Sequence, residues 1–184
     1  MQVEKTPLQD CYIIHDKIFK DERGYFFESF NQQTFQNATG LQVAFVQDNQ
    51  SSSSRGVLRG LHFQTGQHSQ AKLVRVLHGE VLDVAVDLRK SSPTFGQSFS
   101  IILSENSATQ LYIPRGFAHG FAVLSPTAVF FYKCDNFYNK ASEGGIIYND
   151  PQLSIDWMIP AIDLIISEKD AVLPLFNNDV TIFE

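Results

Sequence analysis

Side chains that can take up or release protons lie within stretches of this sequence that otherwise resemble apolar strands. They are His62, Lys72, Asp83, His119 and Tyr132. Considered singly, each has an ordinary explanation, such as a hydrogen-bonded core histidine, a packing tyrosine or a solvated lysine. Together they supply a base, an acid and a cation among apolar neighbours. Because burial disfavours the charged form of histidine and lysine, several such residues in one barrel indicate a polar pocket.

Elements of period two must position these residues. Lys72 is in phase with Val74 and Val76, Asp83 with Val81 and Ala85, and Tyr132 with Ala128 and Phe130. The pattern predicts strands at 11–15, 24–30, 43–49, 56–64, 97–104, 109–114, 119–124 and 127–134, and a two-stranded hairpin over 71–88 that turns at 78–80. Their spacing fits an antiparallel barrel or sandwich. Helical signal is limited to 31–39 and a short segment in 167–174 that Ser167 could cap.

Composition bounds the class of protein. The 184 residues, 43% of them hydrophobic, are enough for one domain spanning 1–184. A net charge of -6 argues against nucleic-acid binding, although a few converging basic residues could still hold a small anion. No secretory signal and no apolar run of about 20 residues is present, so we expect a cytoplasmic protein without a membrane segment. Cys11 and Cys134 are expected to be reduced and packed.

One stretch conflicts with simple strand alternation. Arg59 and His62 are three positions apart in GVLRGLHFQ, so an ideal strand would place them on opposite faces. Gly60 lies between them, and a glycine within a strand often marks a bulge that re-aims side chains. We therefore expect an irregularity at Gly60 that turns both side chains into the mouth of the barrel.

A metal site is the first chemistry to test. LYIPRGFAHGF, residues 111–121, contains Pro114, Gly116 and His119 in a pattern that resembles the second motif of the cupin barrels. In the first cupin motif a second histidine follows His62 two positions later, but Gln64 stands there, and His68 replaces the expected glutamate. An amide oxygen is a poor substitute for imidazole toward a transition metal. The sequence predicts a cupin-like barrel with no metal and no cofactor.

A more specific resemblance covers nearly the whole chain. The segments GVLRGLHFQ, QAKLVRVLHGEVLDVAVDLR, YIPRGFAHGF, YKCDNFYNKASEGGI and SEKDAVLP occur in this order, preceded by DERGYFFESF and VQDNQS. Together they resemble the dTDP-4-dehydrorhamnose 3,5-epimerases of rhamnose biosynthesis. The resemblance implies a mainly β, cupin-like antiparallel jelly-roll barrel with a few short peripheral helices. It also implies a homodimer acting on a dTDP-linked 4-keto-6-deoxyhexose, and the strand at 11–15 is a candidate edge for pairing two copies.

Roles for the reacting groups follow from that resemblance. C3 and C5 both adjoin the C4 ketone, so loss of either proton gives an enolate at one oxygen, and inversion needs a base and an acid on opposite faces. The resemblance makes His62 the base, Asp170 its orienting carboxylate, Tyr132 the opposite acid and Lys72 the cation at the C4 oxygen.

The remaining implied residues bind the anionic nucleotide. The diphosphate or sugar would be contacted by Arg23, Arg59, His119 and Lys169. The polar edges of the base and ribose would be bound by Glu28, Gln47, Asn49 and Glu143. Tyr138 would stack on thymine, and Asp83 would tune Lys72.

Three alternatives remain open at this point. An epimerase that inverts one carbon of a related keto-deoxysugar would use the same acid and base. A metal-dependent cupin oxygenase would retain bound iron, and a non-catalytic module would bind the sugar nucleotide without exchanging its protons.

Overall fold

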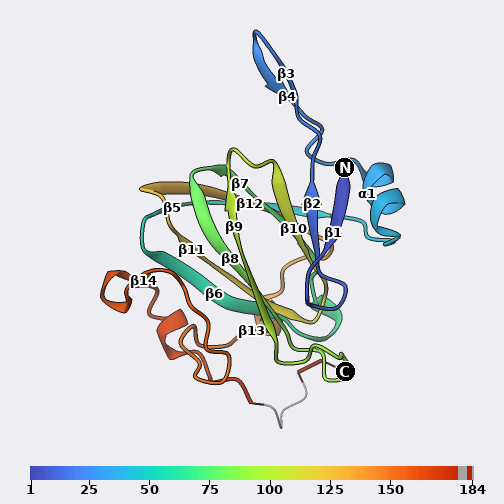
Figure 1. The fold of residues 1–184 in the computed structure, drawn as a ribbon. Helices are drawn as coiled ribbons and strands as arrows, with labels where there is room; N and C mark the ends of the chain where they lie inside the picture. The colour runs from blue at the N-terminus through green and yellow to red at the C-terminus, as the bar shows by residue number, and fades with distance from the viewer. Residues whose placement is uncertain (178–181, 184) are drawn as a thin grey trace.

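Two β-sheets packed face to face form the body of the protein (Figure 1). The computed structural model describes residues 1–177, 182 and 183. In this part of the chain the first sheet has the strand order β1-β2-β10-β7-β12-β5 and the second β13-β6-β11-β8-β9, with β14 parallel to β6. The cupin-like, mainly β architecture predicted from sequence is confirmed.

The bounds of the elements are as follows. The first sheet contains β1 (Gln2–Lys5), β2 (Tyr12–His15), β10 (Thr109–Ile113), β7 (Lys72–His78), β12 (Thr127–Cys134) and β5 (Gln47–Ser54). The second contains β13 (Glu143–Gly145), β6 (Val57–Gln64), β11 (Phe117–Val123), β8 (Glu80–Asp87), β9 (Ser98–Ser104) and β14 (Ile165–Ile166). β3 (Phe19–Asp21) and β4 (Gly24–Phe26) pair with each other, α1 is Gln32–Thr39, and the 3-10 helices are η1 (Gly66–His68), η2 (Lys140–Ser142), η3 (Ala161–Asp163) and η4 (Asp170–Val172).

The main core lies between the two sheets. The alternation of β7 and β12 sends Val74, Val76 and Phe130 inward, where they meet Val81 and Phe121 of the second sheet. Phe130 is 1% exposed, and burying a side chain of this size contributes about 1.5–3 kcal/mol. This apolar wall is the surface from which the in-phase polar residues project.

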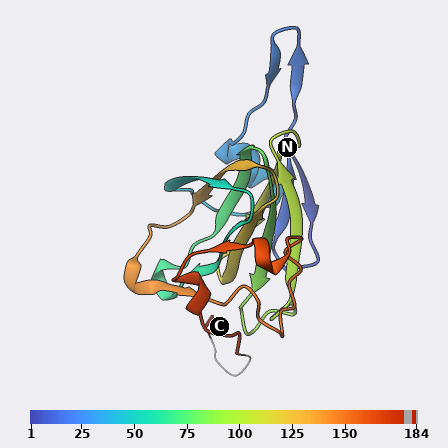
Figure 2. The same ribbon diagram turned by 90° about the vertical axis from the view of Figure 1, so that its left-hand side faces the viewer.

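Both sheets are also covered on their outer faces. The segment after β13 runs across the second sheet, where Trp157 and Phe176 pack against Leu58 and Leu82 (Figure 2). β8 and β11 therefore have apolar neighbours on both sides, which explains why they are buried over almost their whole length. Phe35 of α1 covers the first sheet beside Tyr112.

The helix predicted at 31–39 is confirmed, with Asn31 as its cap. The Asn31 side chain accepts a hydrogen bond from the Thr34 N–H at 3.0 Å, which satisfies one of the free donors at the helix start. In the segment 167–174 only the 3-10 turn η4 forms. Lys169, not Ser167, is the N-cap residue of this turn, although the Ser167 Oγ accepts from the Asp170 N–H at 3.1 Å.

The hairpin predicted over 71–88 is wrong. β7 and β8 are both strands, but they lie in opposite sheets, and β7 pairs with β10 and β12 while β8 pairs with β9 and β11. Gly79, at φ +77°, makes the turn between the sheets, and a Cβ there would lie 2.1 Å from the Thr127 carbonyl oxygen. Periodicity identifies strands but carries no information about their partners.

Three other strand predictions need correction. The strand expected at 43–49 instead spans Gln47–Ser54, because the serine run pairs with β12, while Val43 and Phe45 pack near α1. Of 24–30 only Gly24–Phe26 is a strand. The segment 11–15 is not an edge, because β1 and β10 flank β2 on both sides.

The β3–β4 hairpin extends away from the body of the protein (Figures 1 and 2). Both strands are exposed, and they pair with no other strand in the described residues. In those same residues, no helix has both the length and the apolar character that a bilayer crossing requires. Cys11 and Cys134 are free and buried, as predicted.

Candidate active site

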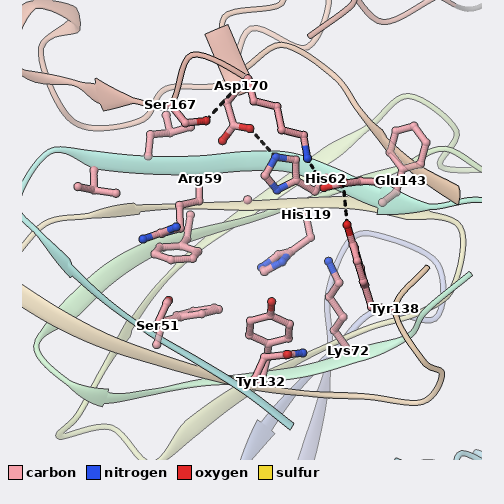
Figure 3. Close-up of a pocket in the computed structure, with 18 of the residues that line it drawn as sticks. Ser51, Arg59, His62, Lys72, His119, Tyr132, Tyr138, Glu143, Ser167 and Asp170 are labelled. Carbon is pink, nitrogen blue, oxygen red and sulfur yellow. Dashed lines mark hydrogen bonds and ion pairs between the residues drawn. The ribbon is translucent and has the colours of Figure 1, made fainter. Parts of the chain in front are cut away.

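A cavity of about 640 Å³ opens between the two sheets. Most of the residues predicted from sequence line it: Gln47, Asn49, Arg59, His62, Lys72, His119, Tyr132, Tyr138, Glu143, Lys169 and Asp170. Figure 3 shows Tyr132 and Lys72 rising from one wall toward His62 and His119 on the other. The structure therefore brings base, acid and cation types into one space.

His62 is held by a buried carboxylate. Its Nε2 lies 2.7 Å from one Asp170 oxygen, and the other Asp170 oxygen accepts the Gly60 N–H at 3.3 Å. Asp170 is 4% exposed, whereas the His62 side chain remains 32% exposed, toward the cavity it lines. A carboxylate only accepts hydrogen bonds, so this contact favours the neutral tautomer with the proton on Nε2, which leaves Nδ1 as the acceptor. The pair has the geometry of an oriented general base.

The irregularity predicted at Gly60 is confirmed. Gly60 has φ +131°, and the pairing of β6 with β11 shifts register between His119 and Phe121. A Cβ at Gly60 would lie 2.6 Å from the Gly120 Cα, so no other residue fits without movement of the backbone. The shift allows Arg59 and His62, three positions apart, to line the same cavity.

Tyr132 and Lys72 face His62 from the first sheet. Lys72 Nζ lies 5.9 Å from the centre of the Tyr132 ring. Burial raises the pKa of the Tyr132 phenol, so this group keeps its proton at neutral pH. Burial lowers the pKa of Lys72, although the charge of Asp83 partly opposes the effect. The side chain retains some exposure to the cavity, while protein surrounds the rest of it.

His119 lines the cavity above a buried acid. Its Nε2 is 2.8 Å from an Asp83 oxygen, and Asp83 is fully buried. Burial lowers the pKa of His119, and Asp83 opposes that shift. Asp83 itself does not line the cavity and has no direct access to a ligand there. It contacts His119, and its charge favours the protonated form of Lys72, as expected of a residue that tunes the lysine.

Comparison with known proteins shows the family of this chain. The sequence model of the dTDP-4-dehydrorhamnose 3,5-epimerase family matches residues 5–178. A dTDP-4-dehydrorhamnose 3,5-epimerase of Salmonella typhimurium is 53% identical over 177 residues, which are 96% of each chain. This protein belongs to the dTDP-4-dehydrorhamnose 3,5-epimerase family.

Solved structures agree with that assignment. The crystal structure of a dTDP-4-dehydrorhamnose 3,5-epimerase from Elizabethkingia anophelis is 60% identical, with a TM-score of 0.94 over 98% of both chains. A Legionella pneumophila epimerase solved in complex with dTDP-4-keto-L-rhamnose is 50% identical, with a TM-score of 0.91 over 95% of this chain and 92% of that one.

Polar and charged side chains lie at the mouth of the cavity. Tyr138 donates to a Glu143 oxygen at 3.1 Å, and the Lys169 ammonium donates to the other oxygen (Figure 3). The hydrogen bond from Lys169 is the main cause that lowers the pKa of Glu143. Arg59 is exposed and donates to the Ser53 hydroxyl. These groups form a polar rim above the apolar wall.

Two predicted ligand residues lie outside the cavity. Arg23, on the β3–β4 hairpin, pairs with Asp21, and Glu28 accepts from the Asn31 amide at 3.2 Å. Neither lines the cavity of its own chain, so their contact with the nucleotide stays a prediction. Among the described strands, β3 and β4 pair only with each other, and Arg23 lies in the turn that joins them, away from the sheets.

Sequence reasoning missed some cavity residues, among them Gln64, Ser51 and Ser167. Gln64 is two positions after His62 and therefore on the same face of β6, a signal that could have found it. No group of three or more His, Cys, Asp or Glu side chains arranged to hold a metal occurs in residues 1–177, 182 and 183. The expectation that this family member needs no metal stays a prediction.

Proposed function

We propose that this protein, acting as one catalytic domain, inverts C3 and C5 of dTDP-4-dehydro-6-deoxy-D-glucose to give dTDP-4-dehydro-L-rhamnose. Membership of the epimerase family supports this isomerase activity. The observation that carries the mechanism is the placement of the His62–Asp170 pair and Tyr132 on opposite walls of one cavity, with Lys72 beside Tyr132.

Proton removal begins the reaction. His62 Nδ1 takes the proton from C5 or C3, and the electrons of the broken C–H bond form a C=C bond while the C4 carbonyl becomes an enolate oxyanion. Asp170 stabilises the imidazolium that results. The Lys72 ammonium stabilises the oxyanion, a charge that is absent from the ground state.

Reprotonation from the other face inverts the carbon. Tyr132 donates its phenolic proton to the enolate carbon, the C4 carbonyl re-forms, and solvent then restores the proton of Tyr132 and removes that of His62. Because both carbons share the C4 oxygen, a small shift of the sugar lets one acid–base pair serve both positions.

The rim residues hold the nucleotide. Arg59, Lys169 and His119 lie where they can contact the diphosphate or sugar, and Gln47, Asn49 and Glu143 can read the polar edges of the base and ribose. Tyr138, 52% exposed at the mouth, offers a ring on which thymine can stack. Reduced, buried cysteines are consistent with the cytoplasmic location that we also propose.

Replacing Tyr132 with phenylalanine should separate the two proton transfers. Abstraction by His62 continues, but inversion loses its donor, so product formation should fall about 100-fold while deuterium uptake from heavy water falls much less. Tyr148→Phe, outside the cavity, serves as the control. Equal losses of uptake and inversion would show that Tyr132 is not the opposite-face acid.

A homodimer would account for the residues that lie outside their own cavity. The hairpin exposes Phe19, Tyr25 and Phe26 at 53%, 67% and 69%, an apolar surface suited to another copy of the chain. We propose that it brings Arg23 and Glu28 to the cavity of a second copy.

Mixing two inactive or weakened variants tests the exchange of hairpins. Arg23→Ala should raise KM about tenfold because a charged contact is lost. When Arg23→Ala and His62→Ala chains are refolded together in equal amounts, half of the dimers contain one chain of each kind. In such a dimer one of the two cavities has both an intact His62 and an intact Arg23 from the other chain. Roughly a quarter of the normal site activity should therefore return. No recovery would mean that Arg23 does not serve a partner's cavity.

Turnover of the 4-keto-6-deoxyglucose nucleotide in heavy water tests the function itself. NMR should detect deuterium at both C3 and C5, together with the inverted product. Labelling at one carbon indicates a single-carbon epimerase. Tight binding with no exchange indicates a non-catalytic module, and iron retained after purification indicates an oxygenase.

A further inference from the structure

The loop between β12 and β13 carries Tyr138 to the mouth of the cavity with little burial to hold it. Tyr138 is 52% exposed, and within the described part of the chain its hydroxyl donates only to Glu143, a neighbour on the same rim. Its ring position therefore depends on where the backbone of residues 138 and 139 is fixed.

We infer that Gln64 is a positioning residue that fixes this loop and thereby the Tyr138 ring. Gln64 is 6% exposed at the end of β6, and its Oε1 accepts the Asn139 N–H at 2.8 Å. Gln47, from β5 in the other sheet, accepts the preceding N–H, that of Tyr138, at 3.0 Å. Two amides from opposite sheets thus hold consecutive backbone donors.

The backbone of the same strand aligns the other side of the rim. Gln64 pairs in register with Glu143, and the Thr65 N–H donates to the Ser142 carbonyl at 2.8 Å. The Asn139 side chain accepts the Ala141 N–H at 2.8 Å and begins η2. Gln64 therefore fixes the position of Tyr138 through its side chain and the position of Glu143 through its main chain.

This role explains a glutamine where cupins place a histidine ligand. The Oε1 of Gln64 accepts the Asn139 N–H, and a side chain of this length with an acceptor at its end is needed to satisfy that partly buried donor. Loss of the acceptor leaves the N–H unpaired and frees the loop. The inference rests on the proposed nucleotide-binding role of Tyr138.

Gln64→Met tests the inference, since methionine has a similar length and no comparable acceptor. The Kd for dTDP, measured by calorimetry, and the KM for the keto-sugar nucleotide should each rise about tenfold, while kcat changes less than about threefold. Gln64→Glu keeps an acceptor and should remain within about threefold of the wild type for dTDP. Thr94→Val, which removes a buried hydrogen bond to Asp87 outside the cavity, controls for general destabilisation.

Introducing Gln64→Met into a Tyr138→Ala variant shows whether Gln64 acts through Tyr138. In Tyr138→Ala, which should itself weaken dTDP binding, adding Gln64→Met should change the Kd less than about twofold. An unchanged Kd in Gln64→Met, or the same tenfold loss in both backgrounds, would overturn the inference while leaving the stacking role intact. An unaltered Kd in Tyr138→Ala alone would overturn the stacking role, and the inference with it.

Hydrogen exchange of the wild-type protein gives a readout that needs no variant. The amides of Tyr138 and Asn139 should be protected despite the exposure of the loop, because both donate to side-chain amides. Rapid exchange of the Asn139 amide would contradict the proposal that Gln64 fixes this loop.

Discussion

His62→Ala should reduce deuterium exchange at C3 and at C5 by about 10²–10⁴-fold, because one imidazole serves both carbons. The affinity for dTDP should remain near that of the wild type, since we propose that His62 contacts the sugar and not the dTDP part of the ligand. Proton NMR in heavy water measures the exchange, and calorimetry measures the affinity.

His78→Ala is a suitable control for this variant. His78 is exposed, pairs with Glu105 at 3.0 Å and lies outside the cavity. Exchange at a near-normal rate in His62→Ala would assign the base to another residue. Loss at only one carbon would mean that two bases share the reaction.

Lys72→Met should lower kcat by about 10²–10³-fold, the cost of losing one preorganised group at an oxyanion. The fold should be no less stable, because the substitution removes a charge that burial disfavours and keeps a side chain of similar length. Steady-state kinetics and thermal unfolding test the two halves separately. Full activity in a folded Lys72→Met variant would exclude Lys72 as the enolate cation.

Titration of Lys72 should change catalytic activity and folding stability in opposite directions as the pH rises. Burial lowers the pKa of Lys72 from its usual 10.5, so kcat should begin to fall on the alkaline side at a pH below that value. Between the folded and unfolded pKa values the unfolded chain binds more protons, so the contribution of Lys72 to stability increases with pH over the same window. Lys72→Met should lose both slopes.

Local pattern predicted much of the active site. Alternation placed Lys72 with Val74 and Tyr132 with Phe130, and these four residues do share the space between the sheets, because the side-chain period of a strand is set by its own backbone. Gly60 between Arg59 and His62 also predicted the irregularity that occurs there.

Long-range pairing accounts for the failures. Val81 and Val76 have the pattern of hairpin neighbours, yet their strands lie in opposite sheets, since partner choice depends on hydrogen bonds made to distant segments. Ser51–Ser54 has weak strand propensity, but pairing with β12 makes it a strand. For the same reason the sequence did not reveal the hydrogen bond between Gln64 and Asn139, because the two residues are 75 positions apart.

By itself, the sequence determined the strand-rich class, the faces on which the polar residues lie and, through its ordered motifs, the epimerase family. The resemblance named Asp170 as the partner of His62, but the tertiary structure brings the two together across 108 positions. The tertiary structure also decided that Asp83 lies behind His119 rather than in the cavity, and that Arg23 does not line the cavity of its own chain. The division has a physical reason: the direction of a side chain is set by local backbone geometry, whereas its partners are set by which distant segments exclude water together.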